Sequence, residues 1–477
     1  MEHDREKKSA ERIDASMEEV GKERSQDVGE TYELKKRFSR FTILSMTVIL
    51  MATWEALSST MVSALISGGP VSLVYGYILA LVGSLATAAS LGELSSMYTT
   101  AGGQYHFTAK LAPTKLKNIL SWAVGWIGTF GWIAFAASAP FLAATMIQGL
   151  VVLNHETYVP ERWQGTLIYW ALVFIATALN IWGTRLLSLV ESASLVIHIG
   201  AFIGNFVVIW ICAPVKHPAE FVFATFQNNS GWSSSGVAWS LGMLSSCYVL
   251  TGFDGAIHLS EEMNNPTTAV PYCMLSSVLL NGAMGFAFLL TVLFCMGDMD
   301  TALNSATGFP IIEIFRTATG SSAATIPGHI HLAKLDKKTQ MPATAVMATS
   351  TVLVLLGLIN IGSTTAFNAI ISLAVLGLQV SYLVPVALML WRRLISHATL
   401  VYGPWRMGRF GVAINVVSLV YLIYTSIFMV FPPYQPVTAE NMNYASLIFG
   451  AVLIFSGVYW VWKGRRQYNG PDIHILA

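Results

Sequence analysis

Long apolar runs separated by short polar loops are the feature that most limits how this chain can fold. Eleven of these runs reach the roughly 20 largely apolar residues that a helix needs to cross a bilayer. They lie at residues 41–66, 71–92, 119–152, 165–183, 187–212, 236–260, 271–296, 343–361, 365–391, 410–431 and 444–462. In lipid every backbone polar group needs a partner within the protein, and a helix supplies these partners itself. We therefore expect an all-α integral membrane protein.

The composition supports this class and excludes several others. Hydrophobic residues make up 54% of the chain and charged residues 11%, whereas soluble domains carry about 25% charged residues. A net charge of +1 argues against a nucleic-acid partner. The four cysteines lack metal-binding spacing, and the sequence contains neither a phosphate loop nor an HExxH motif. We therefore predict no cofactor, no bound metal and no enzymatic activity.

The charged residues divide the chain into three parts. Of the 53 Asp, Glu, Lys and Arg residues, 21 lie in the first 40 positions, with few large apolar residues among them. We therefore expect residues 1–40 to form a disordered, solvated cytoplasmic tail. Residues 41–463 form the predicted transmembrane domain, and residues 464–477 form a second, short cytoplasmic tail.

The distribution of positive charge indicates that one crossing is missing. Cytoplasmic loops of membrane proteins are enriched in Lys and Arg. With a cytoplasmic amino terminus and eleven spans, only 4 of the 17 Lys and Arg residues beyond the tail lie inside. One additional crossing between residues 300 and 335 would bring 14 of the 17 inside, yet that segment is too polar to lie in lipid. We infer that a span has been lost near Thr325-Ile326; the alternative is a true eleven-span protein.

The sixth apolar run contains the strongest functional signal. Asp254 lies between Gly252 and Gly255 at bilayer depth, after the apolar residues 237–250. A charge in hydrocarbon costs about 2.5–3.5 kcal/mol on insertion scales, so such a residue usually faces a polar cavity. Glycines at that depth are typical of the interrupted helices at which secondary transporters bind substrates. The alternative is a glycine-kinked, continuous span with Asp254 near the membrane surface.

Several short motifs along the chain resemble those of one transporter family. These motifs are Trp54–Leu57, Ser67–Pro70, Ala89–Leu94, Thr100–His106, Gly252–Gly255, Glu261-Glu262 and Asn265-Pro266. Over about residues 40–465 the chain resembles the fungal amino acid/choline transporters. These are GABA-permease-like members of the amino acid–polyamine–organocation superfamily.

The resemblance implies a fold and a substrate site. Members of this family have twelve spans, of which the first ten form two inverted five-helix repeats and the last two are C-terminal helices. Their first and sixth helices are broken, and the free backbone groups at such breaks attract a carboxylate or an ammonium. Here the breaks would lie near residues 55–59 and at residues 251–255. The implied substrate-binding residues are Trp54, Glu55, Ala56, Ser58, Ser59, Thr251, Gly252, Phe253, Asp254 and Gly255.

Other roles remain open for several of these residues. Glu55 and Trp54 could be structural, and Ser58 and Ser59 could serve only close helix packing. Asp254 could pair with an ammonium or carry a transported proton. His198, the only histidine deep in an apolar run, is a second proton-coupling candidate, with a structural role as the alternative.

Further candidate residues lie near the ends of the spans. Glu93, Glu261 and Glu262 lie near predicted cytoplasmic ends, so we assign them to gate or loop ion pairs. Asn228 begins an Asn-Asn-Ser sequon in a loop expected outside and is a candidate N-glycosylation site. The resemblance also places the lost span: residues 304–325 resemble the loop after the family's seventh span, and residues 326–342 the loop after its eighth.

We therefore predict a permease that moves amino acids such as GABA, or related amines, across a membrane by alternating access with proton coupling. The alternative substrate is choline or another quaternary amine. We expect the plasma membrane as its location, with the vacuolar membrane as the alternative. The lost span makes a non-transporting relic or splice form the alternative from a different functional class. We expect the 477-residue form to transport poorly or not at all.

Overall fold

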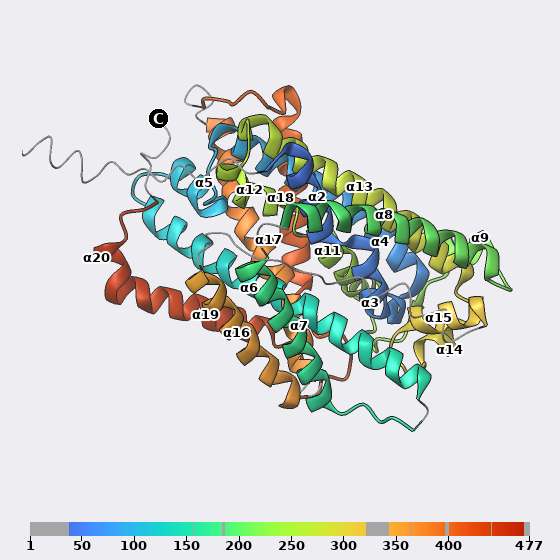
Figure 1. The fold of residues 1–477 in the computed structure, drawn as a ribbon. Helices are drawn as coiled ribbons and strands as arrows, with labels where there is room; N and C mark the ends of the chain where they lie inside the picture. Colours follow the sequence, from blue (N-terminus) through green and yellow to red (C-terminus); the bar gives the residue numbers. More distant parts are fainter. Residues whose placement is uncertain are drawn as a thin grey trace, which may run out of the picture. The chain divides into compact units, whose positions relative to one another are not determined.

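The structure is a computed structural model that describes residues 38–155, 157–183, 187–320, 343–362, 364–395, 400–439 and 441–471. Most of these residues are helical, which confirms the all-α class (Figure 1). Two short strands, β1 Ser67–Gly68 and β2 Gln227–Asn228, pair antiparallel, with Ser67 opposite Asn228.

Ten stretches among the described residues are long and apolar enough to cross a membrane. The first is divided into α2 Arg40–Met51 and α3 Thr53–Ile66. The last combines α19 Ala445–Tyr459, the π-helix η5 Trp460–Gly464 and α20 Arg465–Gln467. The others are α4 Gly69–Met97, α6 Lys117–Asn154, α7 Arg162–Trp182, α8 Leu187–Cys212, α13 Pro266–Cys295, α16 Ala343–Gly362, α17 Thr364–Ile395 and α18 Gly411–Phe428.

The sixth predicted span is absent from these ten because it is broken into short helices. They are α10 Ser235–Gly242, α11 Leu244–Val249 and α12 Gly255–His258. With this broken span, the described residues contain the eleven crossings that the sequence predicts. The remaining elements lie between spans: α5 Gln104–Leu111, α9 Ala219–Ala224, η1 Ser260–Glu262, α14 Met299–Leu303, α15 Pro310–Thr319 and η4 Gly408–Phe410.

Local sequence explains where several of these helices begin. Ser39 caps α2, because its Oγ accepts a hydrogen bond from Thr42 N at 3.1 Å. Pro70 and Pro266 lie in the first turns of α4 and α13, where a missing N–H costs nothing. Gly68, with φ 115°, supplies the turn from β1 into α4 that an L-residue with a side chain rarely adopts.

The spans run between the two ends of the helical bundle, and we name these ends by the direction of the first span. The near end is where α2 begins at Arg40, and the far end is where α3 ends at Ile66. The β1–β2 pair lies at the far end, and a bridge between Phe38 and Met263 lies at the near end. The chain therefore alternates between the ends from α2 to α13, which ends at the far end.

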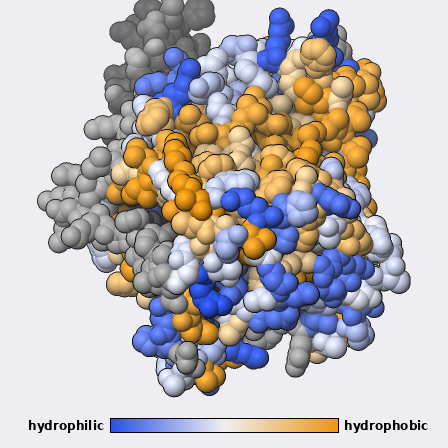
Figure 2. All heavy atoms as spheres, turned by 90° about the vertical axis from the view of Figure 1, so that its right-hand side faces the viewer, coloured by the Kyte–Doolittle hydropathy of each residue, from blue (hydrophilic) through white to orange (hydrophobic). Residues whose placement is uncertain are grey.

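Burial separates central helices from peripheral ones. In the most apolar 18-residue stretch of α17, 67% of the residues are buried, whereas in that of α16 only 11% are buried. Exposed large side chains such as Phe174, Ile211 and Ile454 project from the peripheral helices. Figure 2 shows hydrophobic residues over a broad, continuous area of one face, with hydrophilic residues gathered mainly below it. Such a surface is suited to lipid.

The direction of α16 leaves a discontinuity in the described chain. α16 lies antiparallel to α7 (Figure 1), with Arg162 Nη1 donating to Gly362 O at 2.7 Å and Thr177 Oγ1 2.6 Å from Ser350 Oγ. Because α7 begins at the far end, α16 begins at the near end. The segment that leads to α15 lies at the far end, against Gly149 of α6. The described chain therefore leaves the far end at Gly320 and resumes at the near end at Ala343. The predicted loss near residues 325–326 falls outside the described residues.

Candidate functional site

The first interruption lies at Ala52, between α2 and α3. Ala52 adopts a left-handed conformation, with φ 39° and ψ 48°, which ends α2. The prediction of a break near residues 55–59 is therefore wrong, because α3 continues through those residues. Ser58 and Ser59 donate their hydroxyl hydrogens to Trp54 O and Ala56 O within α3, at 3.0 and 2.8 Å. Helices tolerate such bonds without breaking.

Asn281 of α13 connects the two half-helices at this interruption. Its Nδ2 donates to Val48 O at 3.1 Å, and its Oδ1 accepts from Thr53 N at 3.4 Å. The side chain is fully buried. Sequence reasoning missed this residue, although a signal was present: Asn281 is the only amide side chain in the apolar run 271–296.

Glu55 and His198 form a polar pair between the first and fifth spans. Glu55 Oε1 lies 2.6 Å from His198 Nδ1. The Glu55 side chain is 34% exposed and the His198 side chain 2%. Glu55 Oε2, His198 Nε2 and Trp54 Nε1 are buried without a hydrogen-bond partner among the described residues. The Trp54 ring packs near His198, with centroids 6.0 Å apart, and contacts Phe202 and Phe288.

The second interruption occupies residues 250–254, between α11 and α12, at the predicted place. Gly252 has φ 103°, a conformation that L-residues with side chains rarely adopt. Thr251 Oγ1 donates to Cys247 O at 2.7 Å, which keeps its hydroxyl within α11. Phe253 is buried, with its ring centroid 5.7 Å from that of Tyr382.

Asp254 is the centre of a buried hydrogen-bond network at this interruption. Its carboxylate accepts from Gln104 Nε2 of α5 and from Tyr382 Oη of α17, both at 2.7 Å. His258 Nε2 lies 3.7 Å from the same carboxylate, one helical turn further along the chain. Asp254 is fully buried. The network therefore connects α5, α12 and α17 and engages both carboxylate oxygens with protein donors.

The predicted gate residues lie at the near end. Glu93 forms a buried ion pair with Arg393, and its other oxygen accepts from Met407 N at 3.0 Å. Glu261 Oε1 accepts from Ala101 N at 3.0 Å. Glu262 contributes its backbone oxygen, which accepts from Phe38 N at 3.2 Å. These contacts connect the ends of several spans at one end of the bundle.

The histidine of α5 lies in the same region. Burial lowers the pKa of His106, and the positive charge of Lys110 acts in the same direction. We therefore expect His106 to be mostly neutral at physiological pH.

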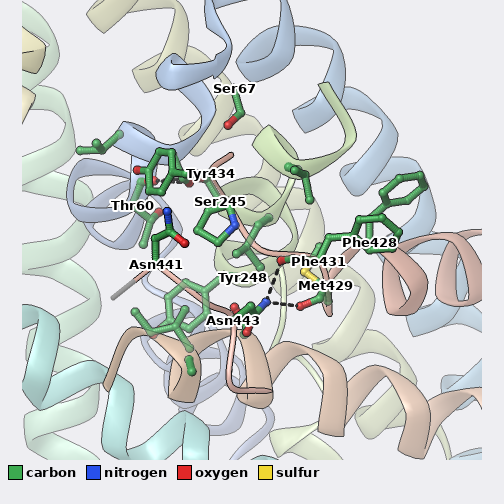
Figure 3. A pocket seen from close by; sticks show the side chains of 18 of the residues that line it. Thr60, Ser67, Ser245, Tyr248, Phe428, Met429, Phe431, Tyr434, Asn441 and Asn443 are labelled. Carbon is green, nitrogen blue, oxygen red and sulfur yellow. Dashed lines mark hydrogen bonds between the residues drawn. The ribbon is translucent and has the colours of Figure 1, made fainter. Parts of the chain in front are cut away.

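A pocket of about 320 Å³ lies between the far-end parts of both interrupted spans (Figure 3). It is lined by α3, α10, α11 and α17, and by the loop segments 429–439 and 441–443, in which Asn443 Nδ2 donates to Met429 O and Phe431 O. Burial raises the pKa of Tyr434 in this loop, so its hydroxyl stays neutral. No charged residue lines the pocket within the described part of the chain. Polar lining residues include Ser59, Thr60, Ser63, Ser245, Tyr248, Ser372, Tyr434, Asn441 and Asn443.

Of the predicted substrate-binding residues, Ser59 alone is among the residues that line this described pocket. Ser59 is one turn beyond Glu55, on a helix whose hydroxyl stripe continues to Ser63, which lies 2.8 Å from Ser245 Oγ. The sequence did not point to Tyr248 or to the loop 429–443, because the residues that form the pocket are far apart in the chain. Tyr248 Oη lies 2.7 Å from Ser138 Oγ of α6.

Asn228, the candidate glycosylation site, begins a tight turn at the far end. Its Oδ1 accepts from Ser230 N at 3.1 Å, and its Nδ2 donates to Trp232 O at 2.7 Å. The acceptor nitrogen of the sequon is therefore engaged in the folded protein.

Two interrupted helices with a pocket beside them, in a bundle of apolar spans, define a class. This is a multi-pass, all-helical membrane protein with interrupted spans, and interrupted spans are where transporters place their binding sites. Among the described residues, no group of three His, Cys, Asp or Glu side chains could hold a metal ion.

Comparison with known proteins identifies the family. The profile of the family described as amino acid permease matches residues 38–330 and 326–454. The chain therefore belongs to the amino acid permease family, and its members are transporters rather than enzymes. The two matched segments meet at residues 326–330, inside the gap between α15 and α16.

Proteins similar to this chain come from fungi and plants. The choline transporter of Saccharomyces cerevisiae is 30% identical over 475 residues, covering 92% of this chain and 83% of its own. Amino-acid permease 2 of Neurospora crassa is 28% identical, covering 96% of this chain and 90% of its own. Amino-acid permease BAT1 of Arabidopsis thaliana is 25% identical, covering 96% and 97%.

Proposed function

We propose that this protein is a secondary active transporter that carries a small amino acid or amine across a membrane by alternating access. The observation that carries the proposal is the pocket between the far-end parts of both interrupted spans. In such folds one group of helices rocks or gates against the other around the fixed site, which opens the site to one side and then to the other. The near-end network around Asp254 then acts as the closed gate of the present conformation.

For the substrate we propose an amino acid such as GABA. The described lining is uncharged, so a zwitterion, whose two charges balance, brings no net charge into a low-dielectric site. Hydroxyl oxygens from Ser59, Ser63 and Ser245 can accept hydrogen bonds from an ammonium group. The Asn441 amide donates one hydrogen to Pro436 O at 2.9 Å and retains a second N–H for a carboxylate.

Choline or another quaternary amine is the second candidate substrate, and the relative from Saccharomyces cerevisiae supports it. A quaternary ammonium has no hydrogen to donate and binds instead to aromatic faces. Tyr248, Phe428, Phe431 and Tyr434 bring such faces to the pocket.

Uptake into cells that lack their own permeases tests both candidates. Labelled GABA should enter slowly but saturably, and unlabelled GABA should displace it more effectively than choline does. Ser245→Ala, which removes a pocket hydroxyl, should raise the KM, whereas Ser418→Ala, a buried hydroxyl between α18 and α4, should leave the KM unchanged. Uptake of choline but not of GABA would favour the second candidate.

We further propose that transport is coupled to protons through Glu55 and His198. The pair has one shared hydrogen bond, two unpartnered buried atoms and a partly exposed carboxylate. It therefore offers both a binding place and a route for a proton. Asp254 is less suited to this role, because both of its oxygens already accept hydrogen bonds, from Gln104 and Tyr382. Direct roles in substrate binding for the other predicted residues of the two interrupted spans remain predictions.

For the orientation, we propose that the near end is cytoplasmic and that the protein lies in the plasma membrane, with the vacuolar membrane as the alternative. Positive residues such as Lys110, Lys117, Arg392 and Arg409 belong to near-end segments, as expected for a cytoplasmic face. This orientation places Asn228 on the opposite side.

A specific observation also favours a non-transporting form. The described chain ends at the far end at Gly320 and resumes at the near end at Ala343, and the family match changes segment in the same interval. Residues 321–342 include Pro327, Lys334 and Lys338, a composition unsuited to a lipid-facing helix. We propose that the eighth span has been lost and that this form transports poorly. Rapid saturable uptake by the 477-residue chain would contradict this.

A further inference from the structure

One side chain of α13 bridges the first interruption. Asn281 donates to Val48 O in α2 and accepts from Thr53 N in α3. One amide group thus contacts both sides of the break at Ala52. An amide suits this place because it provides a donor and an acceptor without a charge.

Thr53 extends this contact to the second interruption. Its Oγ1 donates to Val249 O, at the end of α11, with a distance of 2.7 Å. Val249 is the last helical residue before the unwound residues 250–254. The two breaks are therefore joined through one threonine and one asparagine.

The helix that bears Asn281 is itself held in place. Tyr77 Oη of α4 donates to Gly282 O at 3.1 Å, next to Asn281. A Cβ on Gly285 would lie 2.2 Å from Tyr77 Oη and 2.8 Å from Thr53 Cγ2, so the three helices meet closely there. Because packing fixes α13, a change in the angle between α2 and α3 has to break the bonds to Asn281.

We propose that Asn281 is a positioning residue of the transport cycle. With Thr53 it forms a latch that sets the angle between α2 and α3 and couples it to the second interruption. The latch favours the present conformation, in which the pocket lies at the far end and the Asp254 network closes the near end. It releases when the protein opens to the near end. This inference rests on the proposed transport function.

Buried asparagines also serve as ordinary links between membrane helices, and Asn415 provides a matched control. Asn415 is fully buried in α18 and donates to Ser90 Oγ of α4 at 2.9 Å, away from both interruptions. If Asn281 were only such a link, its replacement and the replacement of Asn415 would have the same effects.

A cysteine in the pocket reports the conformation. Ser372→Cys places a thiol in the pocket lining, and Cys212→Ser removes the exposed natural cysteine; the other three are buried. A membrane-impermeant maleimide, added from the side of the far end, then measures access. Loss of two neutral hydrogen bonds in Asn281→Leu should slow labelling about five- to tenfold. Asn415→Leu should leave it unchanged.

Two outcomes would overturn the latch. One is an unchanged labelling rate in Asn281→Leu at equal amounts of membrane-inserted protein, and the other is equal slowing in Asn415→Leu. The assay needs no transported substrate, so a failure to find uptake of GABA or choline would count against the transport proposal and not against the latch. Where uptake is measured, Asn281→Leu should also raise the KM for the probe, because fewer molecules present the pocket.

Discussion

At the scale of single residues, the pairing of Glu55 with His198 gives the proton proposal a direct test. Uptake by the unchanged protein should rise as the external pH falls from about 8 to 5, because the proposed coupling draws on external protons. In His198→Gln the ring that takes up the proton is absent, so uptake should become nearly independent of pH over this range. The measurement is initial uptake of labelled substrate against external pH.

The matched control for this prediction is His217→Gln. His217 Nε2 lies 2.6 Å from Gly297 O at the far end, away from both interruptions. This variant should keep the pH profile of the unchanged protein. A His198→Gln variant that retained the full pH dependence would remove His198 from the coupling mechanism.

Asp254 leads to a second residue-scale prediction. Asp254→Asn keeps the volume but replaces an oxygen that accepts a hydrogen bond with an NH₂ group, which cannot accept from Gln104 or Tyr382. Hydrogen bonds to charged groups contribute about 1.5–3 kcal/mol, so uptake should fall at least about tenfold and thermal stability should drop. Glu220→Gln, in the short far-end helix α9, should change neither. Normal uptake and stability in Asp254→Asn would show that the network is dispensable.

At the scale of elements, Gly252 determines whether the second interruption can form. Its φ of 103° is strained for any L-residue with a side chain, and an added Cβ would lie 3.4 Å from Phe135. Gly252→Ala should therefore destabilise the protein by about 1–3 kcal/mol. Gly200→Ala is the control, because that Cβ would meet nothing within 4 Å in α8. Thermal unfolding of the purified variants measures the difference, and equal midpoints would argue against strain.

The spans and the second interruption could be predicted from the sequence, whereas the first interruption could not. The spans were predictable because a helix that crosses lipid needs a long apolar run, and the runs match α4, α6 and α13 closely. The second interruption was predictable because glycines flank a charge. The first was misplaced, because Ala52 has no sequence signal for a left-handed turn and its conformation depends on Asn281 in a distant helix.

At the scale of the whole molecule, the direction of α16 gives a topology prediction. Asp300 is exposed at the far end and Arg409 is exposed at the near end. Asp300→Cys and Arg409→Cys therefore place one thiol at each end. In a Cys212→Ser background, an impermeant reagent added to intact cells should label the first, and the second only after permeabilisation. Labelling of both from outside would mean that α16 lies the other way round.

The amino-acid sequence alone determined the class of this protein, the number of apolar spans and the second interruption. These follow from local composition, because lipid selects apolar helices and a buried charge between glycines marks a break. Only the tertiary structure decided the place of the first interruption, the partners of Asp254, the pairing of Glu55 with His198 and the residues of the pocket. These depend on contacts between side chains that are far apart in the chain, such as Asn281 with Thr53, and no local pattern encodes them.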